Sequence, residues 1–411
     1  MAVIKPFKGY RPTPQRAALV SSPPYDVMSS DEAREMAAGN PDSFLRIIKP
    51  EIDFTPGNEP IGDALHLHGK SNLDSFIEIG NLIQDESPCF YLYRIQMGDH
   101  IQTGVMAGVS VDEYDAGAIK KHEFTRPDKE NDRTRHINIT NANTGPVFLT
   151  FRNSGNFNSI IEDIVSAAPD LSFSAEDETI HTLWKVNNLQ QLKKLEHYFE
   201  SIAELYIADG HHRAASASRV QKLKMEDNPN HSGEEAYNFF LSVIFPHDEV
   251  QILDYNRVLK DLNNLNIEQF LEQIQHNFSL SPVSILPFPL PAKNIAMLLN
   301  SQWYLLTPSN NILSNDPVDG LEAALLQLHL LNPVLGIDDP RTNHRIDFVG
   351  GIRGIKELER RCELDCQLAF ALPPIKIEQL LSVADSGKVM PPKSTWFEPK
   401  LRSGMVVRKL D

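Results

Sequence analysis

The stretch that decides the fold runs from Leu205 to Ser218 and has the sequence LYIADGHHRAASAS. Its apolar start, Leu205 to Ala208, predicts a short buried strand. The following Asp209-Gly210 pair predicts a sharp turn, because glycine adopts backbone angles that other residues avoid. The small residues from Ala214 onward then favour a helix that continues to about Lys224. A strand, a turn and a helix in this order predict an α/β fold.

The turn at residues 209–213 is a candidate anion site. The N-terminus of a helix directs backbone N–H groups at a ligand and carries the positive end of the helix dipole. His211, His212 and Arg213 would add side-chain donors there. Asp209 is acidic beside an anion site, which suits a Mg²⁺ ligand, a base or a residue that orients a histidine. The alternative is that the histidines cap the turn and Arg213 forms a surface ion pair.

The rest of the chain predicts further alternation of strands and helices. Ala18 to Val27 predicts a strand entering a Pro-rich turn, Ser29 to about Ala38 a helix, and Phe44 to Ile48 a strand. The later segments predict strands at 89–96, 102–111, 146–151, 239–245 and 295–306, and helices at 65–83, 189–201 and 262–277. We expect one core domain over residues 1–250 and a C-terminal α/β lobe over residues 251–411.

A polar stretch with several cations lies between His122 and Arg135. Arg126, Lys129 and Arg133 are spaced to share one face of a helix with Pro near its first turn, where they would clamp a donor phosphate. Glu123 would then hold Mg²⁺. The alternative is a solvated helix face with pairs of opposite charge.

Composition narrows the class of protein. The 411 residues are 41% hydrophobic, which supports a folded core. A formal net charge of -16 disfavours nucleic-acid binding, which depends on neutralising phosphates. The 3 scattered cysteines are typical of a reducing compartment. We find no signal peptide and no apolar run long enough to cross a membrane, so we expect a cytoplasmic protein without membrane partners. The sequence leaves the oligomeric state open.

The 209–213 turn resembles the signature of the free serine kinases, which share the fold of ParB partition-protein nucleotide-binding domains and sulfiredoxins. This resemblance implies that the turn grips phosphates, with Asp209 and His211 among the catalytic residues and Gly210, His212 and Arg213 binding phosphate. The segment from Pro24 to Arg34 is also similar in layout to those kinases. By that similarity Asp26 takes the place of the base that activates the serine hydroxyl, although Asp replaces the expected Glu.

Almost the whole chain resembles a bacterial family catalogued as domain of unknown function 1015. The similar segments are Ser22 to Val27, His122 to Arg126, Asp209 to Arg213, Phe348 to Gly351 and Met390 to Thr395. The resemblance implies a ParB/sulfiredoxin-like core with large insertions and a second lobe. It also raises the option that Lys393, Ser394 and Thr395 reach back into the catalytic cleft to bind substrate or phosphate. Otherwise this loop closes over the edge of a domain.

Together these features predict a phosphotransferase that converts free L-serine to O-phosphoserine, with ATP, ADP or pyrophosphate as donor and Mg²⁺ as cofactor. The same site would also support the reverse reaction. A DNA-binding clamp of the ParB type would need a basic helix-turn-helix. A sulfiredoxin-like enzyme would need a cysteine in the turn. Neither feature is present in the sequence. A non-catalytic regulator that binds a nucleotide or metabolite remains open.

Overall fold

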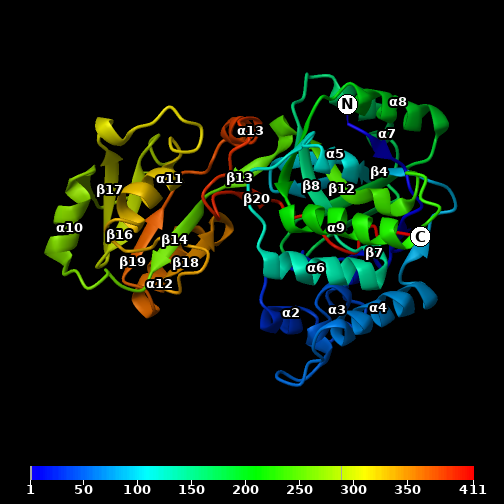
Figure 1. The fold of residues 1–411 in the computed structure, drawn as a ribbon, viewed down its shortest axis with the longest axis horizontal. Coiled ribbons are helices and arrows are strands. Elements are labelled where there is room, and N and C mark those ends of the chain that lie inside the picture. Colours follow the sequence, from blue (N-terminus) through cyan, green and yellow to red (C-terminus); the bar gives the residue numbers. More distant parts are fainter. Residues whose placement is uncertain (1, 288) are drawn as a thin grey trace. The chain divides into compact units, whose positions relative to one another are not determined.

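The computed structural model describes residues 2–287 and 289–411, and the chain divides into two compact units. Unit 1 contains the chain up to Lys120, Thr125–Val250 and Pro399–Asp411, and unit 2 contains Lys121–Phe124 and Gln251–Glu398. Both units combine helices with a sheet (Figure 1). The predicted mixed α/β class is confirmed. The predicted domains over residues 1–250 and 251–411 and the ParB/sulfiredoxin-like fold of the core stay predictions.

A nine-stranded mixed sheet forms the centre of unit 1 among the described residues. Most neighbouring strands are antiparallel, but β6 and β11 are parallel, as are β8 and β12. Along the sheet the strands are β6 (Ile119–Lys120), β11 (Leu205–Asp209), β8 (Val147–Phe151), β12 (Phe239–Pro246), β5 (His100–Ser110), β4 (Phe90–Met97), β10 (Ile180–Val186) and β9 (Leu171–Ser174), with β1 (Ile4–Lys5) beside β5.

The main hydrophobic core of unit 1 lies between this sheet and four helices. The helices are α5 (Val111–Asp115), α7 (Phe157–Val165), α8 (Leu189–Glu200) and α9 (His211–Asp227). Phe157, Leu195, Phe199 and Ala214 from these helices pack in one cluster with strand residues such as Phe151. The small residues of α9 therefore let this helix lie close against the sheet, which fixes the position of its first turn.

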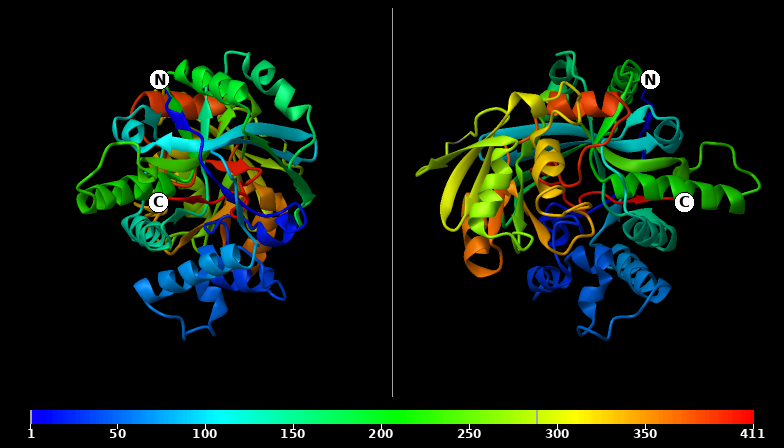
Figure 2. Two further views of the ribbon diagram at one scale, coloured as in Figure 1. Left: turned by 90° about the vertical axis from the view of Figure 1, so that its right-hand side faces the viewer. Right: turned by 60° about the vertical axis from the view of Figure 1, so that its left-hand side comes forward.

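A second hydrophobic cluster of unit 1 joins the N-terminal helices, of which α2, α3 and α4 lie on the other side of α6 from α9 (Figures 1 and 2). These helices are α1 (Ala17–Val20), α2 (Ser30–Met36), α3 (Leu45–Ile48) and α4 (Asp63–Glu78), and α6 spans Pro127–Thr140. Pro127 occupies the first turn of α6, as its fixed φ favours. The predicted helix at the polar stretch is confirmed, as is the predicted helix that starts near Ser29, where the Ser29 side chain caps α2.

Two predicted strands of this region are wrong. The start of the Ala18 to Val27 segment forms the last turn of α1, and Phe44 to Ile48 forms α3 with its N-cap. Both runs are short and almost wholly apolar, so they carry neither the period of a strand nor that of a helix. Packing decides instead: Leu45, Ile47 and Ile48 are all buried in the N-terminal cluster, which an alternating strand facing one core would not allow.

The C-terminal segment of unit 1 runs beside elements that lie far away in the sequence. Ser403 forms a bridge with Ser22, and Val407 forms one with Tyr10. The final strand, β21 (Arg408–Lys409), pairs with β7 (Ala142–Asn143). These pairings bring residue 400 to the end of β11, where the candidate site lies. The remaining small pair of unit 1 is β2 (Tyr10–Arg11) with β3 (Ile83–Gln84).

Unit 2 is built on a six-stranded antiparallel sheet among its described residues. Its order is β15 (Phe278–Val283), β17 (Gln302–Pro308), β16 (Ile295–Leu299), β19 (Leu368–Ala371), β14 (Tyr255–Leu259) and β18 (Ile346–Gly350), and β13 (Gln251–Leu253) pairs separately with β20 (Trp396–Glu398). The helices of the unit are α10 (Ile267–Gln275), α11 (Glu322–Leu326), α12 (Gly354–Leu364) and α13 (Ile377–Asp385). Within the described part of the chain, no helix has both the length and the apolar character that crossing a bilayer requires.

Candidate functional site

The predicted strand, turn and helix around Gly210 are confirmed. β11 ends at Asp209, Gly210 has φ 94° and ψ 29°, and α9 begins at His211. A Cβ atom on residue 210 would lie 3.2 Å from both Cζ and Nε of Arg213. Glycine therefore serves two purposes here: it permits the left-handed backbone, and it leaves room for the Arg213 guanidinium beside the turn.

We expect Gly210→Ala to destabilise the protein more than Gly117→Ala does. Gly117 also has a left-handed φ, of +80°, but a Cβ there would meet nothing within 4 Å. Both variants should lose about 1–2 kcal/mol from the backbone, while only Gly210→Ala also displaces Arg213. Urea denaturation measures the free energy of unfolding of each variant. Equal losses would mean that the guanidinium is not held against the turn.

Four charged side chains of alternating sign meet at this turn, and all belong to unit 1. Arg213 Nη2 lies 3.5 Å from Asp26 Oδ2 and 3.8 Å from Asp209 Oδ1. Lys400 Nζ lies 3.0 Å from Asp209 Oδ2. We call this set of residues, Asp26, Arg213, Asp209 and Lys400, the charged row. It brings together a loop after α1, the end of β11, the first turn of α9 and the C-terminal segment.

Arg213 is the central member of the charged row. Its residue surface is only 9% exposed, and its Nη1 donates a hydrogen bond to the carbonyl oxygen of Pro146. Burial alone would lower the pKa of Arg213, but the neighbouring Asp26 and Asp209 raise it above the ordinary arginine value. The guanidinium is therefore a permanent charge that crosslinks two carboxylates and a loop. The interpretation as a mere surface ion pair does not fit this degree of burial.

Asp209 is held in its ionised form. Burial acts to raise the pKa of its carboxyl group, but Lys400 and Arg213 outweigh that effect and keep the pKa well below the ordinary value. A carboxylate with so low a proton affinity is a poor general base, because catalysis favours a base whose pKa lies near the working pH. The geometry fits Asp209 better as a residue that positions the two cations.

We expect Lys400→Met to make the protein more sensitive to acid. A carboxyl whose folded-state pKa is depressed adds stability above its unfolded pKa of about 3.9, and this stability is lost as the pH falls toward the folded-state value. Removing Lys400 raises the folded-state pKa of Asp209, so the midpoint of acid unfolding should move to higher pH.

Circular dichroism followed during an acid titration measures this midpoint. Lys409→Met is a matched control, since Lys409 lies in the same C-terminal segment but 3.8 Å from the carboxylate of Asp74. If both variants unfold at the wild-type pH, Lys400 does not set the titration of Asp209.

The two histidines of the turn have different surroundings. His211 is 5% exposed. Nε2 of His212 accepts a hydrogen bond of 2.9 Å from the backbone N–H of Arg126, which is the N-cap residue of α6. His212 thus connects the start of α9 to the start of α6. This contact differs from the predicted alternative, in which the histidines cap the Asp209 turn, because it directs one ring nitrogen at the backbone where α6 begins.

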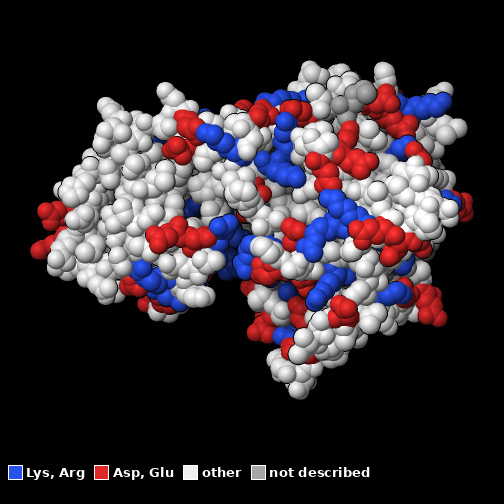
Figure 3. All heavy atoms as spheres, in the orientation of Figure 1, with Lys and Arg blue, Asp and Glu red and all other residues white. Residues whose placement is uncertain are grey.

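The three cations predicted on α6 do not share one environment. Arg126 is exposed and pairs with Asp128 at 2.9 Å, and Lys129 is exposed. On the face drawn in Figure 3, basic and acidic side chains alternate over α6 and α9. Arg133 is buried instead and its guanidinium carbon lies 4.2 Å from the ring centre of Tyr25. A donor-phosphate clamp made of all three stays a prediction.

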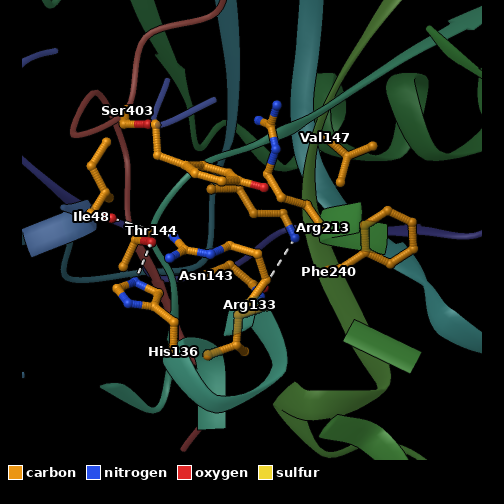
Figure 4. A pocket seen from close by; sticks show the side chains of 13 residues that line it. Ile48, Arg133, His136, Asn143, Thr144, Val147, Arg213, Phe240 and Ser403 are labelled. Atoms are coloured by element: carbon orange, nitrogen blue, oxygen red, sulfur yellow. Dashed lines mark hydrogen bonds between the residues drawn. The ribbon is translucent and has the colours of Figure 1, made fainter. Parts of the chain in front are cut away.

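A small cavity of about 30 Å³ lies beside Arg213 (Figure 4). At about 10–15 Å³ for each water, it has room for about two water molecules or a group of similar size. Nε of Arg213 and Nδ1 of His136 are buried without a hydrogen-bond partner among the described residues. The polar residues of the lining are Tyr25, Arg133, His136, Asn143, Thr144, Arg213 and Ser403, and the others include Ile48, Ile137, Val147, Phe240 and Leu241.

The other predicted site residues belong to unit 2. Glu123 lies in the short segment Lys121–Phe124 of that unit. Lys393 is exposed, and its Nζ lies 5.6 Å from the ring centre of Tyr255. Ser394 is buried and donates a hydrogen bond of 2.6 Å to the carbonyl oxygen of Pro391. Thr395 is half-buried. Their predicted roles in binding Mg²⁺, substrate or phosphate stay predictions.

Sequence reasoning missed Lys400 as a member of the site, together with the cavity residues Tyr25, Thr144 and Ser403. Lys400 follows the polar loop at 390–399, but no spacing rule connects it to Asp209, because 191 positions separate them. Tyr25 directly precedes Asp26 in the predicted Pro-rich turn, and this adjacency was the one available signal. Thr144 and Ser403 carry no sequence signal of this kind.

Several solved structures show a distant likeness to this chain. They include a mutant free serine kinase in complex with AMP (12% identity, covering 72% of this chain and 87% of that chain, TM-score 0.36). A conserved hypothetical protein from Pyrococcus furiosus is 13% identical, with 73% of this chain and 93% of that chain covered and a TM-score of 0.35. SbnI with a C-terminal truncation from Staphylococcus aureus is 11% identical, with 71% of this chain and 82% of that chain covered and a TM-score of 0.37. No curated protein matches the sequence.

The sequence also matches the family model described as "Protein of unknown function (DUF1015)". The match extends over residues 4–325, which include most of unit 1 with Asp26 and the whole turn at Asp209. The residues after 325, including Lys400, lie outside the matched range. Since the match covers more than half of the chain, the protein belongs to the DUF1015 family.

Proposed function

We propose that this protein transfers a phosphoryl group to the hydroxyl of free L-serine and forms O-phosphoserine. The observation that carries the proposal is the charged row at the N-terminus of α9, where Arg213 and Lys400 accompany two carboxylates. Phosphoryl transfer requires little covalent chemistry from a protein. It requires cations that neutralise the moving group, a positioned hydroxyl and help with one proton.

The proposed step breaks the bond between the transferred phosphorus and the leaving oxygen of the donor, and the electron pair stays on that oxygen. A new bond forms between the serine Oγ and phosphorus, and the hydroxyl proton passes to a carboxylate. Arg213, the N–H groups at the start of α9 and Lys400 would stabilise the negative charge of the phosphoryl oxygens. His211 and His212 would complete the surroundings of this group.

Asp26 is the better candidate for the base. Its side chain is 34% exposed and meets the Arg213 guanidinium at 3.5 Å, whereas Asp209 faces two cations. The depressed pKa of Asp209 disfavours proton transfer to it. Asp26 therefore takes the proton in our proposal, and Asp209 holds Arg213 and Lys400 in place.

The cavity beside Arg213 has room for a small group of the substrate. Its volume of about 30 Å³ suits a hydroxymethyl or single phosphoryl group and is far too small for a nucleoside. The donor in this proposal is ATP, ADP or pyrophosphate, and only its terminal phosphate would reach the turn. The rest of a nucleotide would have to lie outside this cavity.

Mg²⁺ is part of the predicted reaction, since a divalent ion would neutralise the phosphates of the donor. Asp209 alone does not provide its site, because Oδ2 contacts Lys400 and Oδ1 faces Arg213. Glu123 remains the other predicted ligand. We therefore derive no step through the ion, and the residues of the charged row carry the argument.

Incubation of the purified protein with L-serine and each donor, with and without Mg²⁺, tests the proposal. We expect O-phosphoserine by ³¹P NMR with at least one donor, and the reverse reaction when O-phosphoserine is supplied with the spent donor. Binding of donors without turnover in either direction would favour the non-catalytic regulator. D-serine is a control for recognition of the substrate backbone.

A further inference from the structure

Arg257 is a buried cation in the sheet of unit 2, on the strand next to the edge strand β18. It lies in β14 with 3% of its surface exposed, directly opposite Phe348 on one neighbouring strand and Phe370 on the other. Its Nη1 donates to the carbonyl oxygen of Tyr255, and its guanidinium carbon lies 5.6 Å from the ring centre of Phe348. Burial lowers the pKa of Arg257 to about 10, so it remains charged at neutral pH.

No carboxylate lies within ion-pair distance of Arg257 in the part of the chain that the structure describes. Other arginines of the same unit are compensated: Arg345 pairs with Asp261 at 2.5 Å, and Arg361 with Asp347 at 2.8 Å. An uncompensated buried charge opposes folding, so proteins pair such groups or use them to bind a ligand. An anion bound beside Arg257 would therefore offset a cost that no described carboxylate offsets.

A second cation contacts the aromatic residues around Arg257. Lys393 Nζ lies 5.6 Å from the ring centre of Tyr255, and that ring lies 5.9 Å from Phe348 and 5.1 Å from Trp396. We call Tyr255, Phe348 and Trp396 the aromatic wall of unit 2. Both cations thus contact one aromatic cluster, although their residues are 136 positions apart in the sequence.

The backbone holds Lys393 in an unusual conformation. Its φ is +57°, in the left-handed region that side chains other than glycine rarely occupy. The Ser394 hydroxyl closes this turn by donating to the carbonyl oxygen of Pro391. Such strain persists where the surroundings hold it, and it is common at ligand-binding sites.

Two acids of unit 2, one three positions before Arg257 in the chain and one bonded to the aromatic wall, are engaged with other groups. Asp254 accepts a hydrogen bond from the Asn256 side chain, and burial raises the pKa of its carboxyl group. Asn256 points to the opposite face of β14 from Arg257, because side chains alternate along a strand. Glu398 accepts a hydrogen bond of 2.8 Å from Nε1 of Trp396.

We propose that unit 2 contains an anion-binding site of its own, in which the Arg257 guanidinium binds a small oxyanion beside the aromatic wall and Lys393 supplies a second positive charge. The planar fork of arginine matches both phosphate and carboxylate groups. The ligand class is therefore a small metabolite that carries a phosphoryl or carboxylate group. The site does not depend on the charged row of unit 1, and its test can succeed where the proposed kinase activity fails.

Isothermal titration of the full chain with inorganic phosphate, pyrophosphate and L-serine, each alone, tests the site. We expect at least one of these ligands to bind the wild type, and Arg257→Gln to weaken that binding about 10- to 150-fold, as loss of a charge-assisted hydrogen bond does. Lys393→Gln should weaken it several-fold. If the affinity for phosphate and pyrophosphate depends on Arg257, the ligand group is a phosphoryl group. If the affinity for L-serine depends on Arg257, it is a carboxylate.

The matched control is Arg408→Gln. Arg408 is 5% exposed, has no described acidic partner and contacts the Phe7 ring, but it lies in unit 1. Arg257→Met is a second variant, because replacing a buried charge by an apolar side chain often preserves folding. Arg213→Gln separates the sites, since it should weaken binding at the charged row alone. The proposal would be overturned if the folded Arg257 variants kept the wild-type affinity, or if Arg408→Gln lost as much affinity as Arg257→Gln. It would also be overturned if the wild type bound none of the ligands.

Discussion

Asp26→Asn is expected to lower kcat for O-phosphoserine formation by about 100- to 10,000-fold, the usual contribution of a general base. Asparagine keeps the size of aspartate and can still accept a hydrogen bond from Arg213, but it cannot take the serine proton at neutral pH. Donor affinity should change little, because the proposed phosphate contacts come from Arg213, Lys400 and the start of α9. Steady-state kinetics and a titration with the donor, on the same preparation, measure the two quantities.

Asp31→Asn is the control for this prediction. Asp31 lies in α2, near Asp26 in sequence, but its side chain is 85% exposed and pairs with Arg34. It should leave kcat unchanged. A near-normal kcat in Asp26→Asn would transfer the role of base to another carboxylate. Glu51 and Glu123 would be tested next, ahead of Asp209, whose depressed pKa makes it the weakest candidate.

Local sequence patterns were sufficient to predict the backbone of the turn at Asp209 and Gly210, which lies at the centre of the site. The strand before Asp209, the left-handed turn at Gly210 and the helix of small residues each follow from neighbouring residues, because glycine and small side chains act over a few positions. The same holds for α6, where Pro127 marks the first turn. Spacing predicted Arg126, Lys129 and Arg133 on one helix, but Arg126 is the N-cap residue before α6, and spacing could not separate exposed from buried positions.

The contacts that complete the site are set by tertiary structure. Lys400 reaches Asp209 because the C-terminal segment bridges to Ser22 through Ser403 and pairs with β7 through β21. Such long-range register leaves no trace in the local sequence. The burial of Arg257 is also invisible there, since an arginine inside a strand usually faces solvent. The strand prediction for the short apolar run at Phe44 to Ile48 was wrong for a related reason, because its conformation is determined by tertiary packing and not by hydrophobic periodicity.

Arg213→Gln is expected to have the largest combined effect on stability and binding. Arg213 is buried between Asp26 and Asp209, so its removal leaves two carboxylates without their shared cation. Breaking a buried ion pair on one side commonly costs about 3–5 kcal/mol of stability. Donor affinity should fall about 10- to 150-fold through the lost charge-assisted contact. Urea denaturation and isothermal titration with pyrophosphate measure these two effects.

Two further variants separate the roles of Arg213. Arg219→Gln, on the same helix, removes an arginine whose side chain is 42% exposed and pairs with Glu130, so it should change stability by less than about 1 kcal/mol and leave binding intact. Arg213→Lys keeps the charge between the carboxylates but loses the fork that reaches Asp26, Asp209 and the Pro146 carbonyl together. We therefore expect it to recover part of the stability and little of the donor affinity. Full recovery of affinity by lysine would show that only a point charge is needed, and unchanged affinity in Arg213→Gln would remove the turn from the donor site.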